Sequence, residues 1–177
     1  AAALASRRRA MAGPVGCGLC GIDSLEGAIR SLPPLPETSL RLTAEEVEVA
    51  LDGLRGWQPL HDETRAVHAA GFWQPGEGIV AAREDVGRHN ALDKLAGALA
   101  RAGIDAASGA VVLTSRVSVE MVQKTVSIGA PVLLAVSSPT AQAVRIAEAA
   151  GLTVVSRAGG RTRLYTHADR IGDAHVL

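Results

Sequence analysis

Three short apolar runs, at 110–114, 131–136 and 152–155, constrain the fold more than any other feature of this sequence. Each run has the length of a buried strand. The segments between them have a helical pattern and end at Gly129 and Gly151, as helices often do. Strands that alternate with helices are typical of a parallel sheet with crossover connections. The sequence therefore predicts an α/β fold.

Other elements are expected on both sides of these units. They are a helix opened by a Thr43–Glu46 capping box, hairpin strands at 65–73 and 78–84, a helix capped by Asn90 with Asp93 and ended by Gly103, and a last strand at 163–165. An antiparallel hairpin followed by parallel βα units makes a mixed sheet. We expect residues 1–40 to be a flexible segment with a proline-rich connector, and 41–177 to be the folded domain.

Composition excludes several classes of protein. Eighteen basic residues balance eighteen acidic ones, so the chain lacks the broad positive field that drives binding to nucleic acid. No apolar run has the length of a membrane span, so no membrane association is expected. The two cysteines are too close together to cross-link a domain of this size, which favours a reducing, intracellular setting.

Cys17 and Cys20 form a CxxC motif with glycine on both sides, at Gly16 and Gly21. Small neighbours leave the sulfurs accessible, and a thiol reacts as the thiolate, with an ordinary pKa of about 8.5. Four interpretations stay open: half of a zinc site, a redox dithiol, a thiol that carries a group such as a persulfide, or two ordinary residues in a loop.

A second candidate cluster is EDVGRHN at 84–90, before a helix. Arg88 and His89 at a helix start are suited to hold an anion or to tune a thiolate. The alternative is structural: an Asn90 cap and a surface pair between an arginine and an aspartate.

A third cluster follows the carboxyl ends of the expected parallel strands, where open α/β sheets bind ligands. Its members are Ser115, Arg116, Ser137 and the segment Val155, Ser156, Arg157, Ala158, Gly159, Gly160 and Arg161. Glycines allow close approach of the backbone and guanidinium groups bind phosphate, so the set favours a nucleotide-like anion. A Gly-Gly pair between arginines is also an ordinary hairpin turn. His68 and His167 are read as hydrogen-bonded structural residues.

Six segments together resemble one protein family. They are CGLCG at 17–21, TRAVHAAG at 64–71, EDVGRHNALDKL at 84–95, TSRVSVEMVQK at 114–124, APVLLAVSSPTAQAV at 130–144 and GGRTRLYTH at 159–167. The family is FdhD, the accessory sulfurtransferase of formate dehydrogenase. The resemblance covers nearly the whole chain, and the segment at 84–95 is its most specific part.

The resemblance implies a sulfurtransferase. It implies that Cys17 receives a persulfide from a cysteine desulfurase, with Cys20 as a second thiol. The sulfur then passes to the molybdenum bis-guanine-dinucleotide cofactor before the cofactor enters formate dehydrogenase. Further implications are a cofactor segment at about 155–161, GDP- or GMP-like ligands as mimics, and a three-layer fold similar to cytidine deaminases. A cytoplasmic location and a homodimer with two pockets are also expected.

The chain departs from the family pattern in two places. The family has a long region ahead of the CxxC motif with no counterpart here, so we expect this chain to be a carboxy-terminal portion. The cofactor segment is one residue short, with Arg157 near a position where the family has an aromatic residue. Deaminase activity is not expected, because no glutamate stands two residues after His68 and no PCxxC motif is present.

Two other functions remain as alternatives to the sulfur carrier. One is a cofactor-binding chaperone that uses no thiol chemistry, and the other is a small zinc-stabilised binding module. No metal ligands are assigned.

Overall fold

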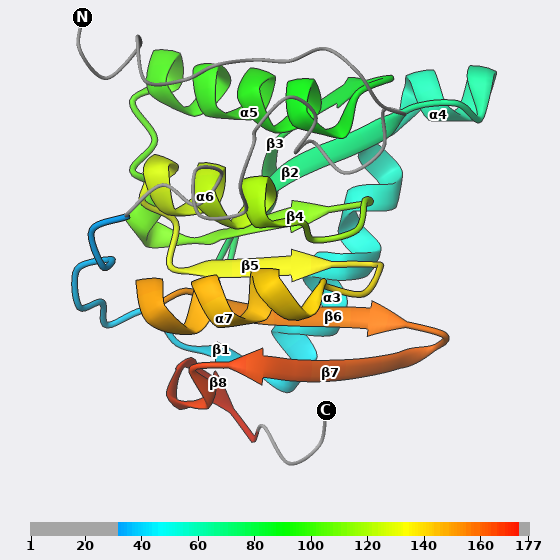
Figure 1. Ribbon diagram of the computed structural model, residues 1–177. Coiled ribbons are helices and arrows are strands. Elements are labelled where there is room, and N and C mark those ends of the chain that lie inside the picture. The colour runs from blue at the N-terminus through cyan, green and yellow to red at the C-terminus, as the bar shows by residue number, and fades with distance from the viewer. Residues whose placement is uncertain (1–31, 174–177) are drawn as a thin grey trace, which may run out of the picture. The chain divides into compact units, whose positions relative to one another are not determined.

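The computed structural model describes residues 32–173 (Figure 1). Its larger elements are α3 (Ala44–Gly53), α4 (Pro59–Thr64), β2 (His68–Gln74), β3 (Gly78–Asp85), α5 (Arg88–Ala102), β4 (Ala110–Leu113), α6 (Val119–Ile128), β5 (Val132–Ala135), α7 (Ala141–Ala150), β6 (Thr153–Ala158) and β7 (Arg161–Thr166). Short pieces complete it: β1 (Leu42–Thr43), β8 (Ile171–Gly172) and the 3-10 turns η1 (Leu54–Trp57), η2 (Ala106–Ser108) and η3 (Ala168–Arg170).

A six-stranded sheet with the order β3-β2-β4-β5-β6-β7 forms the centre of the fold. Strands β4, β5 and β6 are parallel, while the β2–β3 hairpin and β7 run antiparallel to their neighbours. The predicted mixed α/β architecture is confirmed. A separate two-stranded parallel sheet, β1 with β8, was not predicted, because strands of two residues leave no periodic pattern.

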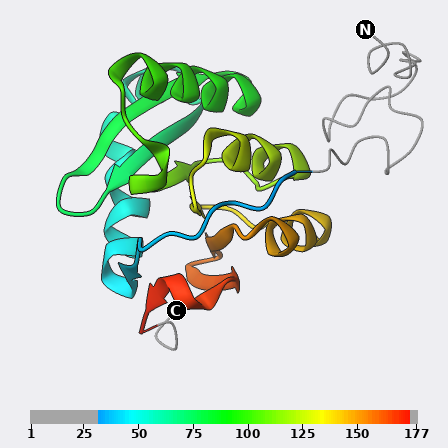
Figure 2. The same cartoon turned by 90° about the vertical axis from the view of Figure 1, so that its left-hand side faces the viewer.

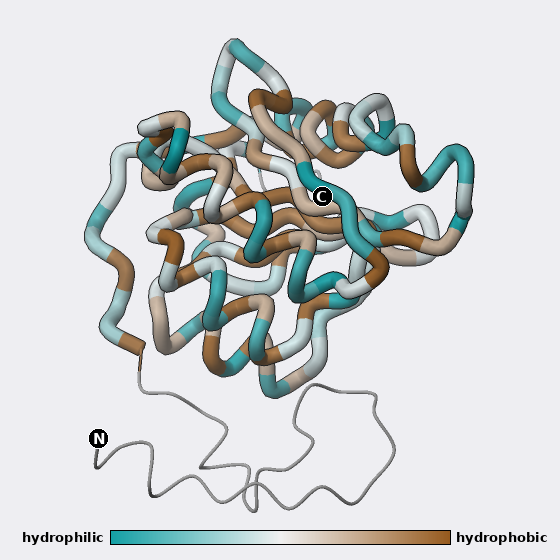
Figure 3. Tube along the Cα trace, turned by 90° about the horizontal axis from the view of Figure 1, so that it is seen from above, coloured by the Kyte–Doolittle hydropathy of each residue, from teal (hydrophilic) through white to brown (hydrophobic). Residues whose placement is uncertain are grey.

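Helices cover both faces of the sheet (Figures 1 and 2). Helices α5, α6 and α7 lie on one face and α3 lies on the other. Side chains alternate between the two faces along a strand. Val112 of β4 and Leu134 of β5 pack with Leu51 of α3, and the residues before and after each of them on its strand face the other helices. Each fully buried large aliphatic side chain contributes about 1.5–3 kcal/mol. Brown apolar segments accordingly run along the interior strands in Figure 3, and teal polar segments alternate with brown ones on the outer helices.

The helix termini confirm most of the predicted boundaries. Thr43 and Glu46 form the capping box of α3, and Gly103, Gly129 and Gly151 end α5, α6 and α7 in left-handed conformation. The cap predicted at Asn90 is wrong. Helix α5 begins at Arg88 after Gly87, without a side-chain cap, and the Asn90 amide instead donates to Asp85 Oδ1 at 3.1 Å.

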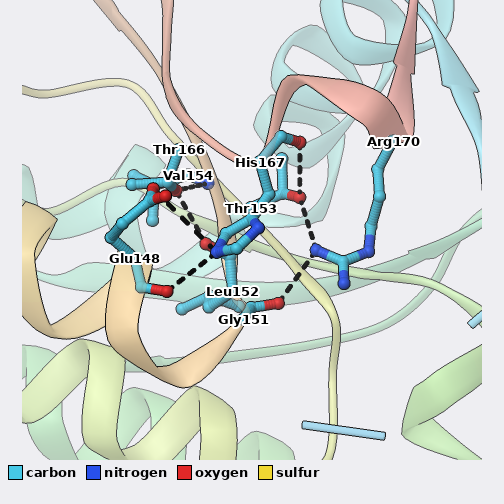
Figure 4. A network of polar contacts seen from close by, with 8 residues as sticks. All are labelled: Glu148, Gly151, Leu152, Thr153, Val154, Thr166, His167 and Arg170. Carbon is cyan, nitrogen blue, oxygen red and sulfur yellow. Dashed lines mark hydrogen bonds and ion pairs between the residues drawn. The ribbon is translucent and has the colours of Figure 1, made fainter. Parts of the chain in front are cut away.

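A polar network joins the end of α7 to η3 at the start of β6 (Figure 4). The buried Arg170 donates to Gly151 O at 2.8 Å and to Thr153 Oγ1 at 3.0 Å. Thr153 Oγ1 donates to His167 O at 3.1 Å, and His167 Nε2 lies 2.9 Å from Glu148 O. A cation beside the last carbonyls of a helix is favourable. His167 is therefore structural, as the sequence predicted.

The division of the chain is close to the proline-rich connector. One compact unit begins at Pro33, and the boundary predicted at residue 40 stays a prediction. No helix among residues 32–173 is long and apolar enough to cross a bilayer.

Gly109 marks a close approach of two backbones ahead of β4. A Cβ atom built on it would lie 2.1 Å from Trp73 O and 2.8 Å from the ring of Phe72. Both partners belong to the buried core, so neither can move aside. Gly97, on the exposed side of α5, has no atom within 4 Å of a built Cβ.

We predict opposite effects for alanine at these two glycines. Gly109→Ala forces β2 and β4 apart and should lower the free energy of unfolding by about 1–3 kcal/mol, as for overpacked cores. Gly97→Ala, the matched control, should raise it by about 0.4–1 kcal/mol through reduced entropy of the unfolded chain. Urea unfolding measures both. Equal stability of the two variants would contradict the assigned strand packing.

Candidate functional site

The candidate site lies where the parallel strands end. Thr114 follows β4 and binds the start of β2: Ala69 N donates to Thr114 Oγ1 at 2.8 Å, and Thr114 N donates to Ala69 O at 3.1 Å. The loop between β4 and α6 is bound to the loop after β5, because Val117 N donates to Ser138 O at 3.4 Å. The beginnings of β2, α5 and α6 are thereby held at one edge of the sheet.

Four polar residues at this edge form what we name the α5–α6 polar cluster: Arg88 and His89 of α5, Ser118 at the N-cap of α6, and Glu120 of α6. His89 Nε2 and Glu120 Oε2 lie 2.6 Å apart, an ion pair when His89 is protonated. These two atoms are therefore each other's polar partner. Arg88 Nε and Ser118 Oγ are buried atoms without a hydrogen-bond partner.

His68 of β2 belongs to the same edge. Burial, together with the charges of Arg88 and His61, lowers the pKa of His68 below its ordinary value of 6.5. A cation favours the neutral form of a neighbouring imidazole. His68, which the sequence suggested was only structural, therefore shares this edge with the charge of Arg88.

Asp85, the last residue of β3, holds the turn between β3 and α5 in place. Its carboxylate accepts from Lys94 Nζ at 2.5 Å, Gly87 N at 2.9 Å and Asn90 Nδ2 at 3.1 Å. The bonds from Lys94, Gly87 and Asn90 lower the pKa of Asp85 to about 2. The aspartate thus pairs with Lys94, and the arginine–aspartate surface pair considered for this segment is not formed.

Arg157 lies apart from this cluster. Its side chain turns to the α3 face and donates to Glu48 Oε2 at 2.8 Å and Asp52 Oδ1 at 2.6 Å. Bonds to the two carboxylates raise its pKa. Thr162 donates to the other oxygen of Glu48. The prediction that the Arg157 side chain joins Arg116 at the strand ends is therefore wrong, because strand alternation directs it to the face covered by α3.

The rest of the predicted cofactor segment forms the β6–β7 hairpin. Val155 is buried in the core against α3, and Ser156 is fully buried with an unpartnered Oγ. Gly159 and Gly160 adopt φ of 60° and 73°, the left-handed pair that a type I′ hairpin turn requires. Ala158 precedes this turn, and the exposed Arg161 follows it.

The remaining predicted residues are scattered. Ser115 is buried and donates to Arg116 O at 3.2 Å, Arg116 is exposed, and Ser137 is half-buried after β5. Cys17 and Cys20 lie outside the described residues. No group of three or more His, Cys, Asp or Glu side chains in residues 32–173 is placed to hold a metal ion.

Sequence reasoning missed two members of the cluster. A serine at a helix start suggests only a cap, yet Ser118 Oγ does not cap α6. Glu120 gave no signal, because an acidic residue in a first turn is common on any helix. Glu120 reaches His89 only through the packing of α6 beside α5, where Lys124 also pairs with Asp93.

The mixed sheet with helices on both faces places this protein in the open α/β class, whose members commonly bind ligands at the carboxyl ends of their parallel strands. Comparison with known proteins narrows this class. The FdhD/NarQ family model matches residues 1–172. The sulfur carrier protein FdhD of Agrobacterium fabrum is 55% identical over 170 residues, which is 96% of this chain and 63% of that protein. The protein of the same name from Brucella abortus is 57% identical over 169 residues, 95% of this chain and 63% of that protein.

A solved structure agrees with the sequence matches. It is a Desulfotalea psychrophila protein assigned as a formate dehydrogenase accessory protein, with a TM-score of 0.70 and 30% identity over 80% of this chain and 60% of that chain. The chain spans about three fifths of the length of these relatives. It belongs to the FdhD/NarQ family.

The Asp85 carboxylate gives a prediction for stability against pH. Its folded pKa, about 2, lies below the ordinary 3.8, so its stabilising effect is fully present above pH 3.8 and is lost as pH falls through about 2. Asp85→Asn should therefore lower the free energy of unfolding at pH 7, with a smaller difference from wild type at pH 3. Urea unfolding at both pH values measures this. Asp169→Asn, which changes an exposed carboxylate, should have no such pH-dependent effect; a constant deficit in the Asp85 variant would contradict the assignment.

The pKa of His68 provides a second prediction. Arg88→Gln should raise it toward the ordinary value, although burial will keep it from a full return. Histidine ring signals followed by NMR during a pH titration measure the shift, and the signal missing in His68→Gln gives the assignment. Arg101→Gln, at the far end of α5, should leave the pKa unchanged. If the pKa of His68 is the same in the Arg88 variant as in wild type, the charge of Arg88 does not act on His68 and the assignment is contradicted.

Proposed function

We propose that this chain is a sulfur carrier that serves formate dehydrogenase, with Cys17 as the residue that carries the sulfur. The supporting observation is the 55–57% identity to proteins named sulfur carrier protein FdhD over at least 95% of the chain. At most eight of the 177 residues lie outside these alignments, so the CGLCG segment at 17–21 lies within them. The proposal selects the group-carrying interpretation of the CxxC motif.

The chemistry proposed for Cys17 is a persulfide exchange. The Cys17 thiolate attacks the outer sulfur of a persulfide on a cysteine desulfurase, and the desulfurase cysteine leaves as a thiolate. The S–S bond to the desulfurase breaks as the S–S bond to Cys17 forms, so no outside oxidant or reductant is needed. Cys20 is the second thiol of the motif. This activity makes the protein a sulfurtransferase, working in the reducing environment of the cytoplasm.

The acceptor proposed for the sulfur is the molybdenum bis-guanine-dinucleotide cofactor, here a substrate. Its diphosphate groups need cations, and Arg88, Arg116 and Arg161 have no ion-pair partner among the described residues. The hairpin at 155–161 is the segment that the family resemblance favours for the rest of the cofactor. GDP or GMP would serve as mimics.

Two structural assignments are part of this proposal. The order of an antiparallel hairpin followed by parallel βα units supports the cytidine deaminase-like, three-layer arrangement implied by the family. A homodimer is proposed because the cofactor has two equivalent nucleotide ends. The assembly partner is formate dehydrogenase, in agreement with the role assigned to the Desulfotalea psychrophila protein.

The test is sulfur loading. After incubation with a cysteine desulfurase and cysteine, intact-mass spectrometry should show a gain of one sulfur atom on the wild-type chain, and peptide mapping should place it on Cys17. Cys17→Ala should lose the gain almost completely, whereas Ser24→Ala, a nearby hydroxyl control, should keep it. Full loading of Cys17→Ala would refute the assigned carrier.

The alternatives give different results in the same preparations. A chaperone without thiol chemistry requires Cys17→Ala and Cys20→Ala to activate formate dehydrogenase as well as wild type does. A zinc module requires about one zinc per chain by metal analysis.

A further inference from the structure

Strand β7 has a neighbour on one side only. It is the last strand in the order β3-β2-β4-β5-β6-β7, so β6 alone pairs with it in the six-stranded sheet (Figure 1). The outward N–H and C=O groups of an edge strand are free to pair with a further strand unless the chain covers them. Among residues 32–173, no backbone group outside β6 bonds to the backbone of β7.

Two hydrogen bonds at the start of β6 show which way its backbone groups point. Thr153 N donates to Pro131 O, on the β5 side. Val154 N donates to Thr166 Oγ1, on the β7 side. Backbone groups point to alternate sides along a strand. The odd-numbered residues of β6 therefore direct their N–H and C=O groups toward β5 and away from β7.

The hairpin register then identifies the free groups of β7. Arg157 lies opposite Thr162, and Val155 lies opposite Leu164. Because the two β6 residues point away from β7, these are non-hydrogen-bonded pairs, and the backbone groups of Thr162 and Leu164 point outward. Two donors and two acceptors therefore line the outer side of β7, with a repeat of about 6–7 Å between the two residues.

The side chains of β7 determine the kind of strand that fits this edge. Leu164 packs toward the core on the α3 face, so Arg161 and Arg163 project from the opposite face. Both arginines are exposed, and neither has a carboxylate partner in the described part of the chain. Opposite charges across a strand pair stabilise it. Acidic side chains are the matching neighbours.

We propose that β7 binds an acidic, extended segment of a partner protein as an antiparallel seventh strand. The backbones of Thr162 and Leu164 pair with that segment, and Arg161 and Arg163 face its carboxylates. In this mode of recognition the main chain supplies affinity and alternate side chains supply specificity. The inference goes beyond the proposed function and does not rest on it, since the outer side of β7 uses neither thiol.

A second copy of this chain does not match the same edge. Two antiparallel copies joined through Thr162 set arginine opposite arginine, whether the register pairs Thr162 with Thr162 or with Leu164. Like charges directly opposite each other destabilise a strand pair. The exposed arginines therefore disfavour self-pairing of β7 and favour an acidic strand.

The other edge strand, β3, is less suited to an acidic segment. Arg83 and Asp85 share one of its faces, so acidic side chains placed opposite them would be attracted by one and repelled by the other. Glu84 accepts from the first amides of α4, and Asp85 accepts from Lys94 of α5. The end of β3 is thus already engaged with the two neighbouring helices.

The experiment is an NMR titration of the full isotope-labelled chain with a short synthetic peptide that alternates glutamate with threonine. The amide signals of Thr162 and Leu164 should shift, and those of β3 should not. Arg163→Gln should weaken binding about twofold to fivefold, and Arg163→Glu about fivefold or more, because repulsion replaces attraction. Arg101→Glu, a reversal at an exposed position of α5, should change the affinity less than about twofold.

Two methylated peptides separate strand pairing from attraction by charge alone. In the proposed register the threonines lie opposite Thr162 and Leu164 and direct their N–H groups toward β7, whereas the N–H groups of the glutamates point away. N-methylation of the threonines should therefore weaken binding about tenfold or more, through the lost hydrogen bonds. N-methylation of the glutamates keeps the same charge and should leave the affinity within about twofold.

Three results would overturn the proposal. The first is the absence of any shift at Thr162 and Leu164 when wild type is titrated. The second is an equal effect of Arg163→Glu and Arg101→Glu. The third is equal affinity for the two methylated peptides, which would mean that the arginines attract acidic polymers of any kind, nucleic acid included. Both variants change exposed side chains, so each should keep the fold.

Discussion

The pairing of β2 with β4 positions every part of the candidate site. Thr114 closes this pair at the carboxyl end of β4 through its backbone amide and its hydroxyl, which both bind the backbone of Ala69. The antiparallel hairpin is thereby joined to the parallel units, and His68 comes to the edge where α6 begins. The hairpin also leads the chain from β3 into α5, so His89 comes within 2.6 Å of Glu120 there.

Two arginines show how the same side chain serves different purposes on the two faces of this sheet. Arg157 is 25% exposed and bound to two carboxylates of α3, which ties the β6–β7 hairpin to that helix. Arg88 has a buried atom and no counter-charge in the described residues. A pair between partly exposed charges stabilises a fold by a modest amount, about 0–1 kcal/mol. Arg88 is only half-buried, so the rest of its guanidinium stays within reach of solvent.

The backbone was largely predictable from the sequence because periodic and capping signals are local. Apolar runs gave β4, β5 and β6, and glycines in left-handed conformation gave the helix ends. The two-residue strands β1 and β8 leave no pattern, and Asn90 resembles a cap until Asp85 is seen to bind its amide. The side chains were less predictable. Whether Arg157 joins the crevice depends on which face of β6 it occupies and on acidic residues of α3 about a hundred positions away.

The α5–α6 polar cluster is where local consistency of the fold breaks down. The starts of α3 and α7 are capped by Thr43 and Thr140, and Glu84 accepts from the first amides of α4, but α5 and α6 begin without side-chain caps. Natural proteins depart from such rules mainly at functional positions, where the lost stability is offset by the rest of the structure. The core packing on both sides of β4 supplies that compensation. A site of this kind is recognised by the hydrogen bonds it leaves unmade, which no sequence pattern records.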